Sequence, residues 1–378
     1  MKIEYTDIQQ EFELKVKIFA EQIIKPNAAF IDKSEYIPKE VIGAMIDHGY
    51  LGSMIPKEYG GMGLDSISIG ILNEIIGGAC SSTRSLLTVH GMVSLAILRW
   101  GSEKQKKYLL PKLAKGEIIG AFALTEPDTG SDAKSIKTIA TDYKNGYILN
   151  GTKKWITMGQ IATIFLVFAK YKDKVTAFLL EKDNLGLVIN HMGGLIGARG
   201  SMIAELNINN CKIPRDNIIG NPGIGLSHVA LSSLDYGRFT IACGNVGLAQ
   251  SCLEESIQYA RKRKQFNEVI CKHQLVQKMI TEMIVDIEAG RLLCNKAGYL
   301  RDNKSPDSIM QVWIAKYYTS LMANRVANFA LQIHGAKGCS DDYPLERYLR
   351  DSKVSEIIEG TTQIHEVMIA VNSLRKYL

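Results

Sequence analysis

The sequence predicts an α+β protein in which a helical N-terminal domain (residues 1–118) is followed by a β-barrel or β-sandwich domain (119–225) and a C-terminal four-helix bundle (226–378). In the first and last regions, apolar residues recur at three- and four-residue spacing, which is the pattern of amphipathic helices. The middle region instead carries short β-rich runs separated by Gly, Asp and Asn. A chain of 378 residues is long enough for two or three domains.

The N-terminal region contains a series of expected helices separated by turn residues. Pro26 and Pro111 are expected to end the first and the last of them, because proline lacks a backbone N–H and clashes with the preceding turn. The expected helices span residues 8–24, 38–48, 67–76, 90–100 and 102–110.

The middle and C-terminal regions differ in the length of their apolar segments. The expected strands of the middle region span residues 121–124, 147–150, 164–170, 176–181, 187–190 and 204–208. The expected helices that follow are much longer and span residues 226–262, 273–302, 305–334 and 354–376. Long helices joined by short connections are typical of a bundle.

Composition excludes several classes of protein. The chain has 45 basic and 39 acidic residues, and a net charge of +6 over this length gives no reason to expect nucleic acid. No segment has the roughly 20 apolar residues that span a bilayer, and no apolar leader is seen. Seven cysteines without C-x-x-C spacing indicate reduced thiols in a cytoplasmic protein. The histidines show no ligand spacing, so no metal site is expected.

Two segments of the middle region could contact a ligand. Residues 121–132 lead from a strand into a turn rich in hydroxyls and small residues, which could present N–H and hydroxyl groups to a carbonyl or phosphate, or could be a plain β-turn. Trp155 and Thr157 could cover the face and bond the edge of a flat heterocycle, although Trp155 could equally belong to the core.

Two further segments lie in the C-terminal region. Residues 261–264 are four consecutive cations that could bind a diphosphate or could simply favour a helix terminus. Glu359 lies between Ile358 and a Gly-Thr turn, where an apolar setting would raise its pKa and suit it to general-base work. An ordinary N-capping carboxylate on the last helix is the alternative. Neither a P-loop nor a G-x-G-x-x-G motif occurs.

Taken in order, these motifs resemble the acyl-CoA dehydrogenase family over nearly the whole chain. The resemblance rests on Tyr59-Gly60-Gly61-x-Gly63, Thr125-Glu126-Pro127, Trp155-Ile156-Thr157, Arg263-x-Gln265-Phe266, Arg350-Asp351 and Glu359-Gly360-Thr361. Met158, Asn267 and Ala336 depart from the family pattern at places where it has Asn, Gly and Gly.

The resemblance implies that FAD lies between the β domain and the bundle, with a neighbouring subunit contributing to the site. It makes Glu359 the base that removes an α-proton from an acyl thioester while a hydride leaves for flavin N5. Ser131, Asp235 and Arg238 match positions near the substrate. The implied cofactor-binding residues are Phe122, Leu124, Thr125, Gly130, Ser131, Trp155, Thr157, Arg263, Phe266, Gln274, Gln332, Gly335, Thr361 and Gln363.

The sequence also resembles a subgroup that oxidises acyl groups on acyl carrier proteins, making hydroxy-, methoxy- or aminomalonyl extender units for polyketide or mixed peptide pathways. A CoA-linked short- or branched-chain dehydrogenase of fatty or amino acid catabolism is the alternative. A flavin-free binding protein on the same fold and an oxidase that passes electrons to oxygen are further alternatives. The family resemblance also implies a homotetramer, with a dimer as the minimum, and an electron-transferring flavoprotein or another acceptor as partner.

Overall fold

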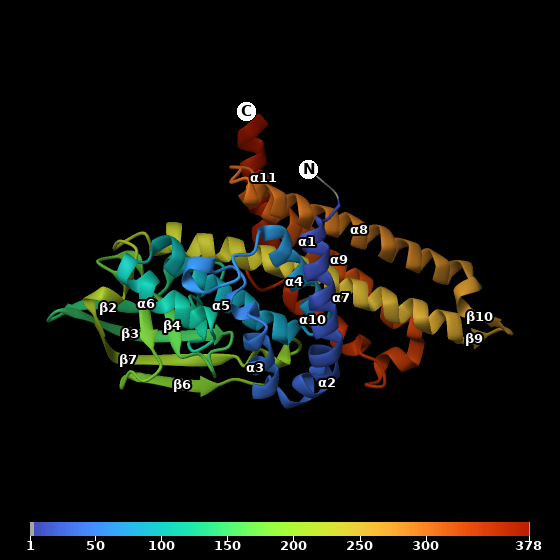
Figure 1. Cartoon of the computed structure of the whole chain (residues 1–378), viewed down its shortest axis with the longest axis horizontal. Coiled ribbons are helices and arrows are strands. Elements are labelled where there is room, and N and C mark those ends of the chain that lie inside the picture. The colour runs from blue at the N-terminus through green and yellow to red at the C-terminus, as the bar shows by residue number, and fades with distance from the viewer. Residues whose placement is uncertain (1–3, 378) are drawn as a thin grey trace.

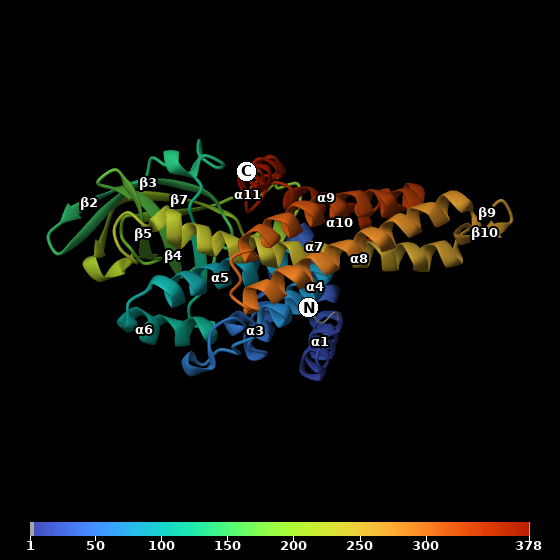
Figure 2. The ribbon, with the colours of Figure 1, turned by 90° about the horizontal axis from the view of Figure 1, so that it is seen from above.

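The computed structural model describes residues 4–377, and it confirms the predicted fold class. Figure 1 shows the β domain at one end of an elongated molecule and a small hairpin at the other end, with the long helices of the C-terminal domain running between them. Figure 2 shows the same separation from above. No helix within residues 4–377 is long and apolar enough to cross a membrane. The first three residues, where a leader would begin, lie outside the described part.

The N-terminal domain is helical, but two predicted helix ends are wrong. Pro26 does not end the first helix, because a π-helical turn at Ala20–Ile24 leads directly into the next helix and places the proline in its first turn, where a missing N–H costs little. Pro111 lies inside a helix that continues to Ala114, since Leu110 and Leu113 on that helix are fully buried. The helices are α1 (Asp7–Phe19), α2 (Lys25–Ser34), α3 (Lys39–Asp47), α4 (Ser66–Ala79), α5 (Ser81–Trp100) and α6 (Glu103–Ala114).

The middle domain is a sheet that curves around its own core. Its strands are β1 (Gly120–Ala123), β2 (Ile139–Tyr143), β3 (Gly146–Ile156), β4 (Ile164–Tyr171), β5 (Lys174–Glu181), β6 (Leu187–His191), β7 (Ala204–Pro214) and β8 (Ile218–Ile219). Within the described residues the order is β6-β7-β3-β2-β4-β5-β8, and β1 pairs in parallel with β4. Every expected strand is present with somewhat different ends.

Strand β4 shows why this sheet can join two cores. Phe165 and Val167 point into the cluster enclosed by the sheet, while Leu166 and Phe168 point into a second cluster shared with α5 and α6. This alternation is the two-residue period of a strand that is buried on both faces. The β domain is therefore packed against α5 and α6.

The C-terminal domain differs from its prediction at one functionally important place. A single helix was expected over 354–376, but the structure contains two helices separated at Glu356–Thr361. Glu359 and Gly360 in this break have positive φ values of 55° and 99°, which helical residues do not adopt. The elements are α7 (Leu231–Lys262), β9 (Lys264–Gln265), β10 (Glu268–Val269), α8 (Gln274–Asp302), α9 (Ser308–His334), α10 (Leu345–Ser355) and α11 (Thr362–Tyr377).

The middle of α10 ties the three domains together. Arg350 pairs with Asp32 of α2 at 2.6 Å and also bonds the carbonyl of Ile196 in the middle domain. The buried carboxylate of Asp351 accepts a 2.6 Å hydrogen bond from the N–H of Ala198, and burial raises its pKa to about 6. The Arg350-Asp351 motif thus fixes the chain just before the Glu359 turn.

Candidate active site

The residues predicted for the site fall into three separate groups. The first, Phe122–Ser131 together with Trp155 and Thr157, lies on the β domain. The second lies around the hairpin and the adjacent end of α9, at the opposite end of the molecule (Figures 1 and 2). The third surrounds the turn that carries Glu359.

Two loops of the β domain lie side by side in the first group. The N–H of Lys154 donates a 2.9 Å hydrogen bond to the carbonyl of Thr125, which places Trp155 beside the Thr125 turn. Trp155 has a φ of 62°, and half of its surface is exposed, so its ring does not belong to the core. A Cβ placed at the exposed Gly130 would meet no atom within 4 Å, which leaves the turn open to a ligand.

A buried ion pair that sequence reasoning did not single out fixes these loops. Lys153 Nζ lies 2.9 Å from Glu126 Oε1 and donates a second 2.9 Å bond to the carbonyl of Leu124. The N–H groups of Lys137 and Thr138 also donate to the Glu126 carboxylate. Burial alone would raise the pKa of Glu126, but Lys153 and these hydrogen bonds hold it below its usual value. Glu126 belongs to the Thr125-Glu126-Pro127 motif, but only the structure shows that Lys153 is its partner.

We expect Lys153→Met to destabilise the β domain by about 3 kcal/mol, because it leaves the Glu126 carboxylate buried without its counter-charge. Urea unfolding followed by tryptophan fluorescence measures the change. The double variant Glu126→Gln/Lys153→Met is the control, and it should recover part of the loss because no charge is then left buried. An unchanged unfolding midpoint for Lys153→Met would contradict this account.

The second group surrounds the β9–β10 hairpin. Phe266 is 94% exposed, and Phe266 and Asn267 have φ values of 52° and 61°. Asn tolerates this left-handed conformation, so the departure from the family's glycine is compatible with the turn. Gln274 is exposed at the start of α8, and Arg263 is exposed just before β9.

The end of α9 lies at the same end of the molecule as the hairpin. The rings of Tyr259 on α7 and His334 on α9 stack with centroids 4.2 Å apart, which brings the Gln332–Gly335 segment beside the hairpin. Gln332 and Gly335 are exposed, and Gly335 has a φ of 60° that suits glycine. In one chain the hairpin lies at the opposite end of the molecule from the β domain, to which Trp155 belongs, as the two views of the fold show.

The third group is built around Glu359, and two buried cations hold its backbone. Arg238 Nε donates a 3.0 Å hydrogen bond to the carbonyl of Glu359. Lys316 Nζ donates a 2.7 Å bond to the carbonyl of Gly360. Two consecutive left-handed residues are thereby fixed from α7 and α9, the helices on which these cations lie.

The Glu359 carboxylate points into the protein. Oε2 is buried and has no hydrogen-bond partner within residues 4–377. It packs against Gly237, where an added Cβ would lie 2.6 Å from Oε2, so this position must be glycine for the carboxylate to sit as it does. Burial raises the pKa of Glu359 to about 7, although Arg238, Lys316 and Arg84 act to lower it.

Thr361, rather than Glu359, caps the last helix. Its hydroxyl accepts a 3.4 Å bond from the N–H of Ile364, and its carbonyl accepts from the ring of His365. The N-capping alternative for the Glu359 side chain therefore finds no support in the geometry. Gln363 is exposed on the first turn of α11.

Asp235 is engaged in a structural contact. Its Oδ2 pairs with Arg301 of α8, and both side chains are almost entirely covered. Burial raises the pKa of Asp235 despite this pairing, and its Oδ1 has no partner within the described residues. Of the two α7 residues predicted to lie near substrate, Arg238 contacts the Glu359 turn, whereas Asp235 contacts α8.

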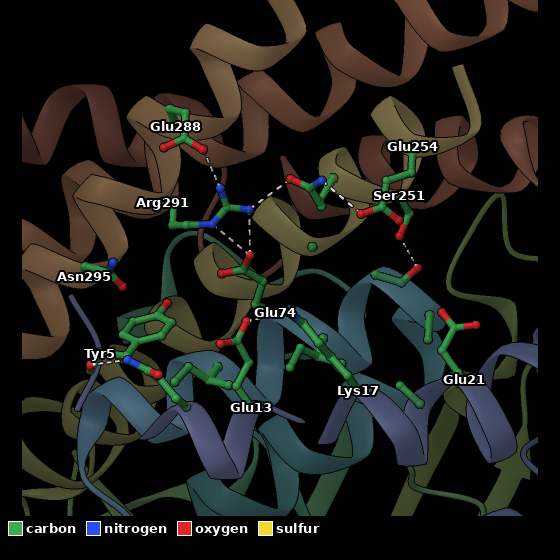
Figure 3. A pocket seen from close by; sticks show the side chains of 18 of the residues that line it. Tyr5, Glu13, Lys17, Glu21, Glu74, Ser251, Glu254, Glu288, Arg291 and Asn295 are labelled. Atoms are coloured by element: carbon green, nitrogen blue, oxygen red, sulfur yellow. Dashed lines mark hydrogen bonds and ion pairs between the residues drawn. The ribbon is translucent and has the colours of Figure 1, made fainter. Parts of the chain in front are cut away.

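A cleft of about 810 Å³ lies elsewhere, between α1, α4, α7 and α8. Figure 3 shows that Arg291 occupies its centre and bonds Glu74, Glu288 and the amide of Gln250. The charged side chains at the centre of the cleft therefore pair with one another. None of the predicted site residues lines this cleft.

The fold is that of the acyl-CoA dehydrogenase family. The N-terminal, middle and C-terminal domains of the acyl-CoA dehydrogenase family match residues 6–117, 121–211 and 225–374, and the chain belongs to this family. A probable acyl-CoA dehydrogenase YngJ of Bacillus subtilis is 38% identical and covers 99% of this chain and 100% of its own length.

Two solved structures are similar throughout. Butyryl-CoA dehydrogenase from Megasphaera elsdenii has a TM-score of 0.95 and 32% identity, over 99% of this chain and 100% of that one. The prolyl acyl carrier protein oxidase AnaB has a TM-score of 0.93 and 32% identity, over 97% of this chain and 99% of that one.

Proposed function

We propose that the protein is a FAD-dependent dehydrogenase that oxidises an acyl thioester, with Glu359 as the catalytic base. The observation that carries the proposal is the buried Glu359 carboxylate, which has an unpartnered oxygen and a pKa raised to about 7. A base whose pKa lies near the working pH is unprotonated often enough to act and basic enough to take a proton.

The residues around the first group fit a flavin. The half-exposed Trp155 ring can lie against a flat heterocycle, and the open turn at Gly130 and Ser131 can receive polar groups. FAD, when bound, supplies the hydride acceptor. Phe122 packs against Phe168 at 5.0 Å, and buried Leu124 lies beside it, so the wall beneath this surface is apolar.

The base itself can also stabilise developing charge. The N–H of Glu359 donates to no backbone carbonyl among the described turns and is free for a thioester oxygen. Hydrogen-bond donors aimed at a developing enolate oxygen lower the barrier electrostatically. Glu359 would thus contribute its carboxylate to the α-proton and its backbone N–H to the carbonyl oxygen.

The carrier of the acyl group is either CoA or an acyl carrier protein. The similarity to butyryl-CoA dehydrogenase supports the first, and the similarity to AnaB supports the second. Anaerobic flavin reduction with matched acyl-CoA and acyl-carrier-protein substrates tests both. Bleaching with the carrier-protein form alone would support the extender-unit pathway, and bleaching with neither would contradict the dehydrogenase. Rapid peroxide release in air would indicate an oxidase instead, and a preparation left colourless after purification with added FAD would support a flavin-free binding protein.

If Arg263 and Phe266 contact the flavin, the site takes them from a second copy of the chain, because the β9–β10 hairpin lies at the opposite end of the molecule from the β domain. Two helices expose apolar residues that a neighbouring subunit could cover. They are Leu275, Ile284, Val285, Leu292 and Tyr299 on α8 and Val367, Met368, Val371 and Leu374 on α11. We infer a homotetramer, or at least a dimer, and an electron-transferring flavoprotein or another acceptor as redox partner.

Mixed oligomers should show whether subunits share the site. Co-expressed Glu359→Gln and Arg263→Glu chains should regain about a quarter of wild-type turnover, because half of randomly paired dimers are mixed and each has one intact site. Each variant expressed alone serves as the control and should be nearly inactive. An active monomer in sedimentation, or no recovery in the mixture, would contradict a shared site.

A further inference from the structure

Two buried cysteines contact each other where α7 packs against α8. Cys243 lies on α7 with 2% of its surface exposed, and Cys294 lies on α8 with 4% exposed. Both are free thiols in the structure. A hydrogen bond between the two side chains, and then burial, raise the pKa of the Cys243 thiol well above its usual value. The proposed mechanism uses neither residue.

Cys294 lies between two glycines on the face of α8 that packs against α7. Gly290 and Gly298 are four residues before and after it, so the three positions share one face of the helix. A Cβ added at Gly298 would lie 3.5 Å from the ring of Phe239 on α7, one turn before Cys243. A Cβ added at Gly290 would lie 3.5 Å from an α7 side chain on the other side of Cys243. The two cysteines are therefore opposite each other in the contact between these helices.

The flanking glycines allow the two helix backbones to approach closely at the cysteine pair. Packed helices usually have axes about 8–10 Å apart, as their side chains dictate. A disulfide needs Cα atoms about 4.4–6.8 Å apart, which calls for a close approach of the two backbones. Glycine on both sides of Cys294 removes the side chains that would hold the helices apart. Two thiols in contact at such a place need only a small movement of their side chains to form a bond.

A third helix confines the Cys243 thiol. A Cβ added at Gly70 of α4 would lie 3.3 Å from Cys243 Sγ, which is closer than ordinary van der Waals contact. The sulfur therefore lies directly against the α4 backbone. Because α4 closes that side, the thiol stays in the space that it shares with Cys294.

The same helix contact continues toward the candidate active site. Asp235 is eight residues before Cys243 on α7, and Arg301 is seven residues after Cys294 on α8, and these two form an ion pair. Two turns of each helix thus separate the thiol pair from the ion pair. A covalent bond between the thiols would tie α7, which carries Arg238 beneath the Glu359 turn, to α8.

The thiol pair lies beneath the floor of the cleft of about 810 Å³ between α1, α4, α7 and α8. Asn295, which follows Cys294 directly, lines this cleft. Glu74 and Tyr5 also line it, and both interact electrostatically with Cys243. Figure 3 shows Tyr5 and Asn295 at the same end of the cleft. A small polar oxidant that enters the cleft there comes close to the thiols.

We propose that Cys243 and Cys294 are a redox-sensitive pair, which peroxide converts into a disulfide that locks α7 to α8. One hydrogen peroxide molecule and two thiols give one disulfide and two water molecules. The O–O bond and two S–H bonds break, an S–S bond forms, and two electrons pass from the sulfurs to the peroxide oxygens. The inference does not depend on the flavin or on an acyl thioester.

The buried setting makes this reaction slow. The thiolate is the reactive form, and the raised pKa of Cys243 keeps its thiol protonated at neutral pH. We therefore expect the disulfide to form over minutes to hours. The reduced pair is accordingly the resting state, and sustained exposure to peroxide closes it.

Peroxide treatment of the full-length protein tests the proposal. The wild-type protein is purified with FAD, freed of reductant, incubated with hydrogen peroxide, alkylated and digested without reduction. We expect mass spectrometry to show one cross-linked peptide pair that contains Cys243 and Cys294, with the loss of two hydrogens, and dithiothreitol to reverse it. The thermal unfolding midpoint of the oxidised protein should rise by about 5 °C, because a cross-link restricts the unfolded chain.

Serine variants show whether these two sulfurs are responsible. Each variant is compared with its own reduced form. Cys294→Ser should lose both the cross-link and the rise in midpoint. Cys339→Ser, which removes an exposed thiol, and Cys252→Ser, which removes another buried thiol of α7, are the matched controls and should keep both.

Three results would overturn the proposal. The first is a wild-type protein in which Cys243 and Cys294 are still alkylated after peroxide has oxidised the exposed Cys339. The second is a disulfide that joins only other cysteines or two chains. The third is an unchanged midpoint in the cross-linked protein, because the bond would then not lock the helices. Peptide mapping of the wild type needs no variant, so it decides the first two points even if Cys294→Ser does not fold.

Discussion

Glu359→Gln should lower turnover of the acyl thioester by about 10³-fold, because an amide cannot accept the α-proton. The flavin content of the purified protein should not change, since Glu359 is not among the residues predicted to bind the flavin. Anaerobic flavin bleaching and the absorption spectrum measure the two quantities. Glu366→Gln, on the exposed side of α11, is the matched control and should bleach normally. Full activity in Glu359→Gln would remove Glu359 as the base.

The same variant should be more stable than the wild type at alkaline pH. The pKa of Glu359 is about 7 in the folded protein against a usual 4.5, so the folded state binds this proton more tightly than the unfolded state does. Its contribution to stability is therefore present at low pH and is lost as the pH rises from about 4.5 to 7. Thermal unfolding should show Glu359→Gln above the wild type by roughly 3 °C at pH 8, with a smaller difference at pH 5.

The periodicity of apolar residues predicted most of the fold because it depends on local geometry. Strand β4 alternates between two cores, and α7, α8 and α9 each bury apolar residues in the main core. The predicted helix boundaries were wrong where tertiary contacts, rather than the local sequence, determine the backbone conformation. Apolar residues continue through Ile357, Ile358 and Ile364, so the sequence pattern does not reveal that Arg238 and Lys316 hold a break between them.

The candidate site shows a similar limit. Motif order singled out Glu359 and two segments of the β domain as candidates, since these residues belong to short runs with recognisable composition. Lys153 is one of two consecutive lysines, and Lys316 is a single cation among apolar residues. Their roles depend on burial and on a partner far along the chain, which a single sequence does not show. A single cation within a strongly apolar helix, such as Lys316, is the sequence signal that could have indicated a buried cation with a structural role.

Lys316→Met should lower turnover by about 10²-fold, because it frees the Gly360 carbonyl and lets the strained turn move the base out of position. It should also change the pH profile. Burial lowers the pKa of Lys316 to about 7, so it titrates in the same range as Glu359 and the wild-type profile contains both groups. Arg238, Lys316 and Arg84 are the cations that lower the pKa of Glu359. Without Lys316, one step should remain, and its midpoint should lie at higher pH.

The pH profile separates positioning from a merely structural role. A variant that only loosened the bundle would lose stability and flavin, but the midpoint for its remaining activity would stay at the wild-type pH. Lys296→Met, which removes an exposed lysine from α8, is the matched control and should change neither rate nor midpoint. If Lys316→Met keeps the wild-type rate, the turn is held by Arg238 alone. If Lys316→Met lowers the turnover rate but leaves the midpoint of the pH profile unchanged, Lys316 acts through its hydrogen bond to Gly360. Its charge then does not influence the base.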